Sequence, residues 1–400
     1  MKNVLRLMTF SALIAAFALT GLAQTAQPAA SPAPAADANK AKCDELYGTW
    51  RDNRNGDAAT QAKAYEAGKT FLADCQTHEY LSYVQNWVPK YEAALKNLNI
   101  QKQYTDAFAK KDWKGVVAAG KQITAAKQDD VATFVAMVYA ATQYAAANPN
   151  DESLNPDAVA AARRALQLID AGKADAFTPE QWKNLGFPNK NELAGWLNST
   201  LGYYTLKSAP GEAAQFVVKA VQNGDMVKKD ASTYNLLAAA YQNAEYAPLE
   251  QDYRANCAGK DLTDECQLKL DKMNLVVDRM IDALARAVAL ADANAATKAK
   301  KAAWMTQLEN LYKFRHEGKT DGLPELIANI QSKPLLLPSM QTLPTRTPTA
   351  PATGGAASAT PTPTATPVSN PSTNNNAPKP ATNNNNAPKP VENPPKPKTF

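Results

Sequence analysis

Apolar residues recur every three to four positions along most of the chain between residues 40 and 332. This spacing is the period of an amphipathic helix, so it favours an all-helical body and disfavours a large sheet. Turn clusters and capping residues divide the segment into six successive helix pairs. These predicted pairs are 44–52 with 58–73, 79–109 with 113–126, 131–146 with 157–171, 192–206 with 211–222, 232–246 with 267–292, and 297–316 with 323–331.

Proline sets the limits of this helical body. Of the 27 prolines, 16 lie between Pro334 and Pro397, and only eight lie in the 293 residues from 40 to 332. We therefore predict an Ala/Pro linker over residues 24–39, a helical domain over 40–332 and a disordered Pro/Thr/Asn-rich tail over 333–400, because such a composition cannot bury enough apolar surface to fold. Inside the body, Pro89 predicts a bend or break in the helix 79–109.

The first 23 residues have the pattern of a secretory signal peptide. Lys2 and Arg6 precede an apolar run over 7–19, and Gly21 and Ala23 provide small residues at a cleavage point. The run is shorter than the ~20 residues that cross a bilayer, although an uncleaved anchor is an alternative. Leu22 stands where a lipoprotein would need cysteine. We expect a periplasmic or secreted protein without a transmembrane segment in the mature chain.

Four cysteines in an exported chain favour two disulfides. Cys43 opens the first predicted helix and Cys75 closes the second, so an antiparallel hairpin would bring them together. Cys257 and Cys266 bracket a polar segment, which a second bridge would close into a loop. The alternative is a zinc site, but the sequence has no Cys-x-x-Cys pair and no histidine near these cysteines. We expect no metal ion and no cofactor.

Several helix pairs resemble the tetratricopeptide repeat. Tyr234, Leu237, Ala238 and Tyr241 match the spacing of that family's first helix, and Trp196, Leu201 and Gly202 match it in part. In the second helix the family places small residues seven apart around a large apolar one, a pattern met by Ala213, Phe216, Val217 and Ala220. The resemblance covers roughly residues 40–332, with good motif agreement from about 190 to 290.

The resemblance implies a right-handed α-solenoid of about six antiparallel helix pairs. Stacked pairs curve and present a concave face lined by their first helices, which typically takes a protein or peptide partner. The residues of the first helices that fall outside the packing pattern are Ser199, Tyr203, Lys207, Asn235 and Gln242. The unit separations of 62, 38 and 70 residues depart from the family's 34. A helical bundle closed around one core is therefore the alternative fold.

Enzyme chemistry finds little support in the sequence. There is no Gly-rich phosphate loop, no His-Glu-x-x-His motif and no nucleophile elbow, and the two histidines, His78 and His316, lie far apart. The body between the termini carries a net charge of about −2, so we expect no nucleic-acid partner. An enzyme or transport component with its site in the insertions 172–190 or 247–266 is the third hypothesis.

These observations lead to two main functional predictions. The first is an extracytoplasmic scaffold or adaptor that binds a protein or peptide in a concave helical groove. The alternative is a structural envelope protein in which the tail makes the contact, through Lys379, Lys389, Lys396 and Lys398. An inert solubilising tail is the other interpretation of the same segment.

Overall fold

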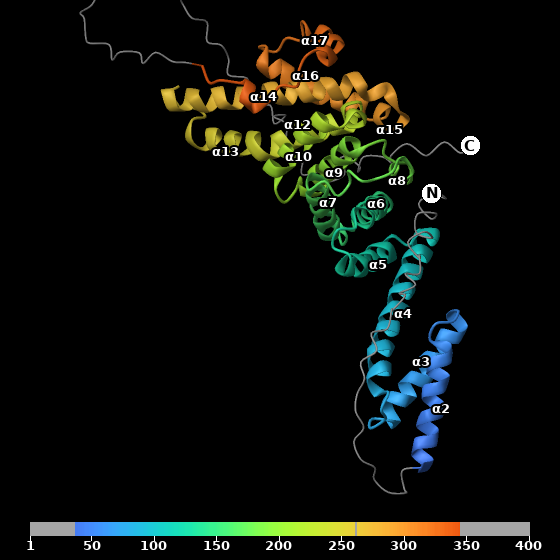
Figure 1. Cartoon of the computed structure of the whole chain (residues 1–400). Coiled ribbons are helices and arrows are strands. Elements are labelled where there is room, and N and C mark those ends of the chain that lie inside the picture. Colours follow the sequence, from blue (N-terminus) through green and yellow to red (C-terminus); the bar gives the residue numbers. More distant parts are fainter. Residues whose placement is uncertain (1–36, 261, 345–400) are drawn as a thin grey trace, which may run out of the picture. The chain divides into compact units, whose positions relative to one another are not determined.

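The computed structural model describes residues 37–260 and 262–344, and every regular element in these ranges is helical. The prediction of an all-α fold is therefore confirmed (Figure 1). Within this part of the chain no helix combines the length and the apolar surface needed to span a bilayer. The predicted signal peptide, the linker up to residue 36 and the tail from residue 345 lie outside the described residues.

The helical segment forms two compact units, which divide between Thr133 and Phe134. The sequence predicts one helical domain over residues 40–332, and the division between the two compact units falls inside that range. The apolar period along a chain shows which residues are buried, but it does not show which core each of them joins.

The N-terminal unit begins with a helical hairpin made of α2 (Asp37–Asn53) and α3 (Ala58–Asp74). Helix α2 includes the last three residues of the predicted linker. Asp57 caps α3, because its carboxylate accepts a hydrogen bond of 2.9 Å from the backbone N–H of Thr60. The hairpin packs with the first turns of α4 around a core that contains Trp50, Phe71, Val84 and Val88.

Helix α4 (Leu81–Lys110) continues through Pro89, so of the predicted bend or break the structure has no break there. Both Pro89 and Gln85, whose carbonyl loses its helical partner at a proline four residues later, are exposed. Water can satisfy that carbonyl on the solvent face, which makes the proline tolerable. After Lys111, which adopts a left-handed conformation with φ 56°, helix α5 (Trp113–Ala126) packs against α4.

The C-terminal unit contains the remaining helices, starting with α6, whose first turn includes the division between the units. Most helix positions agree with the sequence prediction within a few residues, but short helices occupy stretches that the sequence had left irregular. The elements are α6 (Val131–Ala147), α7 (Asn155–Asp170), α8 (Pro179–Leu185), α9 (Lys190–Thr205), α10 (Pro210–Asn223), α11 (Asp225–Lys228), α12 (Ala231–Tyr241), the π-helix η2 (Gln242–Tyr246), α13 (Ala247–Asn256), α14 (Asp264–Leu290), η3 (Ala291–Ala293), α15 (Ala295–Lys298), α16 (Lys301–Arg315), α17 (Leu323–Asn329), η4 (Ile330–Ser332) and η5 (Pro338–Met340).

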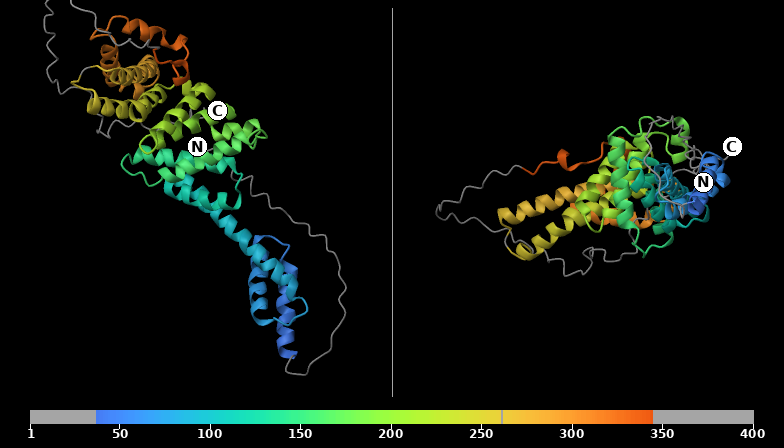
Figure 2. Two further views of the ribbon diagram at one scale, coloured as in Figure 1. Left: turned by 90° about the vertical axis from the view of Figure 1, so that its left-hand side faces the viewer. Right: turned by 60° about the horizontal axis from the view of Figure 1, so that its bottom comes forward.

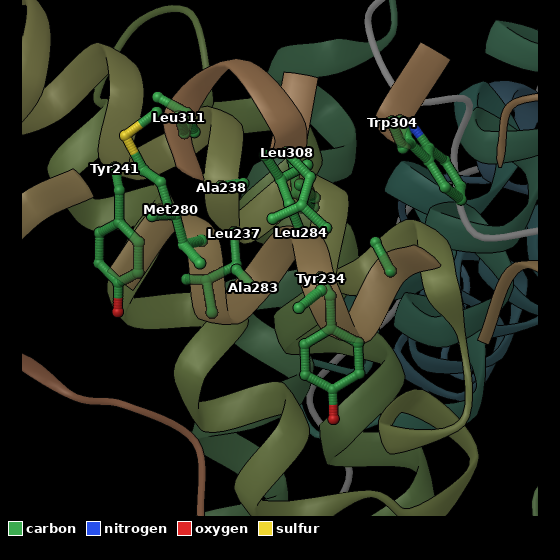
Figure 3. Close-up of a cluster of buried hydrophobic side chains, with 14 of the residues drawn as sticks. Tyr234, Leu237, Ala238, Tyr241, Met280, Ala283, Leu284, Trp304, Leu308 and Leu311 are labelled. Atoms are coloured by element: carbon green, nitrogen blue, oxygen red, sulfur yellow. The ribbon is translucent and has the colours of Figure 1, made fainter. Parts of the chain in front are cut away.

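The longer helices of this unit pack in succession along the chain. Helix α9 contacts α7 and α10, α10 contacts α12, α12 contacts α14, and α14 contacts α16. Figure 3 shows the core between α12, α14 and α16, where Tyr234, Leu237 and Tyr241 lie near Met280, Leu284 and Leu308. The two tyrosines and Leu237 belong to the repeat-like motif of the sequence, and all three are buried.

Gly202, another residue of the motif, allows a close approach of α9 and α10. A Cβ atom at this position would lie 2.5 Å from the Cγ2 atom of Val217 and 3.3 Å from the carbonyl oxygen of Ala213. The spacing between the two helices therefore depends on the absence of a side chain at this position.

Residues 247–256, the first part of the insertion 247–266, form helix α13. They continue α12 through the π-turn of η2, so the chain is helical from Ala231 to Asn256. Pro248 lies two residues after Tyr246, the last residue of the π-turn. A proline ring clashes with the carbonyl four residues earlier, and a wider turn ahead of it relieves that clash, so the helix can continue. Helix α13 runs beside the first half of α14, in the yellow and gold hairpin of Figure 2.

The first residues of the predicted tail belong to the folded part. The Arg286 guanidinium on α14 donates hydrogen bonds to the carbonyl oxygens of Lys333 and Pro334, and Leu335 packs against the core. The side-chain amide of Gln341 donates to the carbonyl oxygen of Leu275 on the same helix, at 2.9 Å. The folded part therefore extends to residue 341 at least, beyond the predicted boundary at 333, because a leucine-rich stretch lies among the first prolines.

Candidate functional site

The five predicted groove residues lie on two neighbouring helices of the C-terminal unit, since α9 and α12 contact each other. Ser199, Tyr203 and Lys207 are four residues apart and therefore follow one face of α9 and its C-terminal end. Asn235 and Gln242 are seven apart, two turns along one face of the helix formed by α12 and η2.

Ser199 cannot contact a partner in this structure, because its exposed fraction is 0%. Its prediction as a groove residue is corrected here. Helix α9 has neighbours on several sides, namely α7, α10, α11 and α12, and they cover nearly every residue from Leu193 to Gly202. The Ser199 hydroxyl is also without a hydrogen-bond partner among the described residues. A polar side chain on such a central helix is not evidence of exposure.

Tyr203 and Lys207 remain accessible at the C-terminal end of α9. Tyr203 is half-buried, and burial raises the pKa of its phenol, with a smaller contribution from the charge of Glu152. Lys207 is exposed and forms an ion pair with Glu152, from the segment between α6 and α7. An exposed pair of this kind is worth about 0–1 kcal/mol, so a partner carboxylate could replace Glu152 at little cost.

Asn235 and Gln242 are half-buried, and Gln242 is the first residue of the π-turn. An amide side chain offers two donors and an acceptor, and so it can bond the backbone of a peptide without selecting its sequence. A π-turn changes which side chains share a helix face, and such turns are frequent at functional sites. The sequence analysis missed this turn, and Pro248 was the signal that could have indicated it.

The π-turn is fastened to α14 by an ion pair that the sequence analysis also missed. The guanidinium of Arg279 donates to both carboxylate oxygens of Glu245, at 2.8 and 2.7 Å, and stacks over the ring of Tyr241. The Arg279 side chain is only 4% exposed. Burial raises the pKa of Tyr241 to about 12, although the nearby Arg279 charge opposes the shift. These contacts hold the turn that carries Gln242 in a defined position.

Both predicted disulfides form, between Cys43 and Cys75 and between Cys257 and Cys266. All four cysteines are therefore used in bridges. Residues 37–260 and 262–344 contain no group of three or more His, Cys, Asp or Glu side chains placed to hold a metal ion.

The two histidines lie in different units of the chain. The His78 Nε2 atom lies 2.9 Å from Asp44 Oδ1 at the end of the N-terminal hairpin. His316 stacks on Tyr312 after α16, with ring centroids 4.0 Å apart.

Three tryptophans are buried, with exposed fractions of 1% for Trp50 and 5% for Trp196 and Trp304. Trp113 is half-buried. In the N-terminal unit, the exposed ring of Tyr80 stacks on that of Tyr47, with the ring centroids 4.4 Å apart. The sequence analysis did not single out these tyrosines.

Comparison of this chain with protein-family models, with curated proteins and with solved structures finds no match. The functional interpretation below rests on the residues and contacts described above.

Proposed function

We propose that this chain is an extracytoplasmic, tetratricopeptide-like scaffold that binds a protein or peptide segment along α9 and α12. The observation that carries the proposal is the pairing of these two helices. They are alternate long helices in the chain, yet they contact each other while α10 packs against both of them. This is the relation between successive first helices in a right-handed solenoid of helix pairs.

The accessible residues on the two helices suit a peptide ligand. Asn235 and Gln242 provide amide groups for a peptide backbone, and Tyr203 provides a half-buried ring with a polar end. Lys207 adds a cation whose present partner is exposed and replaceable. We therefore propose these four residues as the contact set, with Ser199 removed from it.

The extracytoplasmic location is supported by the two disulfides, which persist in oxidising compartments. The signal-like pattern of residues 1–23 points the same way. Fractionation of cells that make the full chain, with a thiol-reactive probe applied before and after reduction, tests the assignment. Labelling without prior reduction would contradict it.

Site-specific photo-crosslinking tests the groove. A photoreactive residue is placed at Asn235 or Tyr203 of the full chain in its native host, with Gln215 on α10 as the exposed control position. We expect one partner to be captured from both groove positions and not from Gln215. Capture of the same partner from Gln215, or of nothing from either groove position, would refute the groove.

Mutation of the proposed contact residues then measures how much they contribute to the affinity for the captured partner. If Asn235 and Gln242 each make one backbone hydrogen bond worth about 0.5–1.5 kcal/mol, the variant Asn235→Ala/Gln242→Ala loses about 5- to 150-fold in affinity. The variant Gln215→Ala is expected to bind like the parent chain. Titration calorimetry with the purified partner measures both.

The second candidate function is a structural envelope protein whose tail makes the contact. It is favoured by the anchoring of residues 333–341 on α14, which gives the following Lys- and Pro-rich residues a fixed point of attachment. A chain ending at residue 344 keeps this anchor and removes the rest of the tail. Reduced retention in the envelope fraction would support the tail contact, and unchanged retention would refute it.

A further inference from the structure

Residues 333–341, called the strap here, lie along one face of α14. The strap bonds near Arg286 at its start and near Leu275 at its end, so it runs antiparallel to the helix. Arg286 lies eleven positions after Leu275, a rise of about 16.5 Å along the helix. Lys333, Leu337 and Gln341 have extended backbone angles, and η5 forms a single turn between the last two.

A charged pair on α14 forms the centre of the contact. Arg286 and Asp282 bond each other at 3.0 and 3.2 Å, and their side chains are 5% and 10% exposed. The Nη2 atom of Arg286 donates to the carbonyl oxygens of Lys333 and Pro334, both at 2.9 Å. The Asp282 carboxylate accepts a hydrogen bond of 3.3 Å from the backbone N–H of Leu336. Within the pair, Arg286 thus donates hydrogen bonds to the backbone of the strap and Asp282 accepts one from it.

These three hydrogen bonds all involve backbone atoms of the strap. They would form equally with other sequences in the same extended conformation, provided that no proline occupies the position of Leu336. Selectivity comes from Leu335, whose side chain packs against the hydrophobic core of the unit. The pair is fixed by its own ion pair and by the position of Arg286 over the Tyr234 ring, so it is ordered before a peptide arrives.

The strap itself remains partly open to solvent. Its residues 333, 334 and 338–340 are exposed, and 335–337 are half-buried. It is joined to the unit at one end only within the described residues, directly after η4. An attached segment with a modest buried area is the type of element that opens locally at low cost.

We propose that the face of α14 formed by Leu275, Asp282 and Arg286 is a binding site for an extended, leucine-containing peptide segment, which the chain's own strap fills as an intramolecular ligand. A partner segment of the same pattern, with a leucine followed by a residue that keeps its N–H, binds by displacing the strap. This site lies on a different helix from the groove proposed above and does not depend on it.

The test uses the full chain and a labelled synthetic peptide with the sequence of residues 332–342. Leu336→Pro removes the N–H that bonds Asp282 and weakens the strap, whereas Leu336→Ala keeps that N–H and is the matched control. In fluorescence polarisation we expect the peptide to bind Leu336→Pro at least tenfold more tightly than the parent chain or Leu336→Ala. A second strap variant, Leu335→Asp, is expected to bind the peptide as Leu336→Pro does.

Changes to Arg286 on α14 and to the peptide test the specificity of the site. Adding Arg286→Gln to Leu336→Pro, or replacing the peptide's own leucine at position 335 by aspartate, should lower the affinity at least tenfold. Circular dichroism checks that each variant keeps its helical content. Failure of the peptide to bind both folded strap variants, or binding that ignores Arg286→Gln, would overturn the proposal.

Discussion

The ion pair between Arg279 and Glu245 provides a quantitative test of how the π-turn is held. The variant Glu245→Met removes both short hydrogen bonds to the guanidinium. Arg279 would keep its stacking on Tyr241 and a long contact of 3.5 Å to the carbonyl oxygen of Leu275. A guanidinium that is only 4% exposed would thus lose its counter-ion without reaching bulk water.

Breaking a fully buried pair by removing one partner costs about 3–5 kcal/mol. Glu245 is 40% exposed, so water can enter the vacated space and replace part of the lost interaction. We therefore expect a loss of about 2–3 kcal/mol in the free energy of unfolding of the C-terminal unit, below the range for a fully buried pair. For a unit of about 200 residues this lowers Tm by about 4–12 °C.

The double variant Arg279→Met/Glu245→Met separates the charge from the packing. It leaves no uncompensated charge and keeps apolar volume at both positions, so it should recover at least half of the loss caused by Glu245→Met alone. Calorimetry of the full chain, with the transition of the C-terminal unit assigned by hydrogen exchange, measures each variant. The control is Arg254→Met, which breaks the more exposed pair with Glu250 on α13 and should cost less than about 1 kcal/mol.

Two outcomes would refute this reasoning. If Glu245→Met costs no more than Arg254→Met, then the buried guanidinium does not depend on its partner. If the double variant is less stable than Glu245→Met, the pair stabilises the folded unit by more than the penalty of an unpaired charge. The expectation that removing both charges restores stability would then be wrong.

Three further predictions concern packing, cross-linking and ionisation. Gly202→Ala should destabilise the C-terminal unit by about 1–3 kcal/mol through the overlap with α10, whereas Gly211→Ala, with open space at its Cβ position, should be tolerated; thermal unfolding compares them. Replacing Cys43 and Cys75 by serine should cost the N-terminal unit about 4 kcal/mol, as expected for a 32-residue loop, and limited proteolysis should then cut that unit first; unchanged cleavage would contradict this. Tyr204→Phe removes a buried hydroxyl that has no partner among the described residues, so stability at pH 7 should stay equal or rise. Burial raises the pKa of the Tyr204 phenol, so the unfolded chain loses this proton at a lower pH than the folded chain does. The free energy of unfolding of the parent chain should therefore fall as pH rises above 10. Tyr204→Phe should lose less stability between pH 9 and 11, and urea titrations at these pH values measure the difference.

The positions of the helices could be predicted from the sequence because their signals are local. Asp57, for example, lies in a turn cluster and caps α3, and the helix from 113 to 126 has the predicted ends. The cysteine pairs followed from the same information, since Cys43 and Cys75 stand at adjacent ends of one hairpin. The local signals were less reliable at proline. At Pro89, where a bend or break was predicted, the helix is not broken, and the π-turn before Pro248 was missed.

The candidate site was predicted less well than the helices. Tyr203, Asn235 and Gln242 are half-buried, and Lys207 is exposed, as a contact surface requires. Ser199 was wrong, because a helix-surface pattern cannot show that α9 has neighbours on several sides. The strap was also missed, since proline-rich composition indicated disorder, whereas Leu335 packs against the core of the unit and the backbone N–H of Leu336 bonds Asp282.

The sequence alone determined the all-helical class, the positions of most helix ends and both cysteine pairs, because periodicity, capping and chain breakers act over a few residues. Only the tertiary structure decided the division into two units, the burial of Ser199, Arg279 and Arg286, and the place of the strap on α14. Each of these depends on residues distant in sequence: Arg286, for instance, meets its backbone partners 47 and 48 positions later. Local sequence patterns do not indicate such contacts, because the free energy of packing decides them only when the helices assemble.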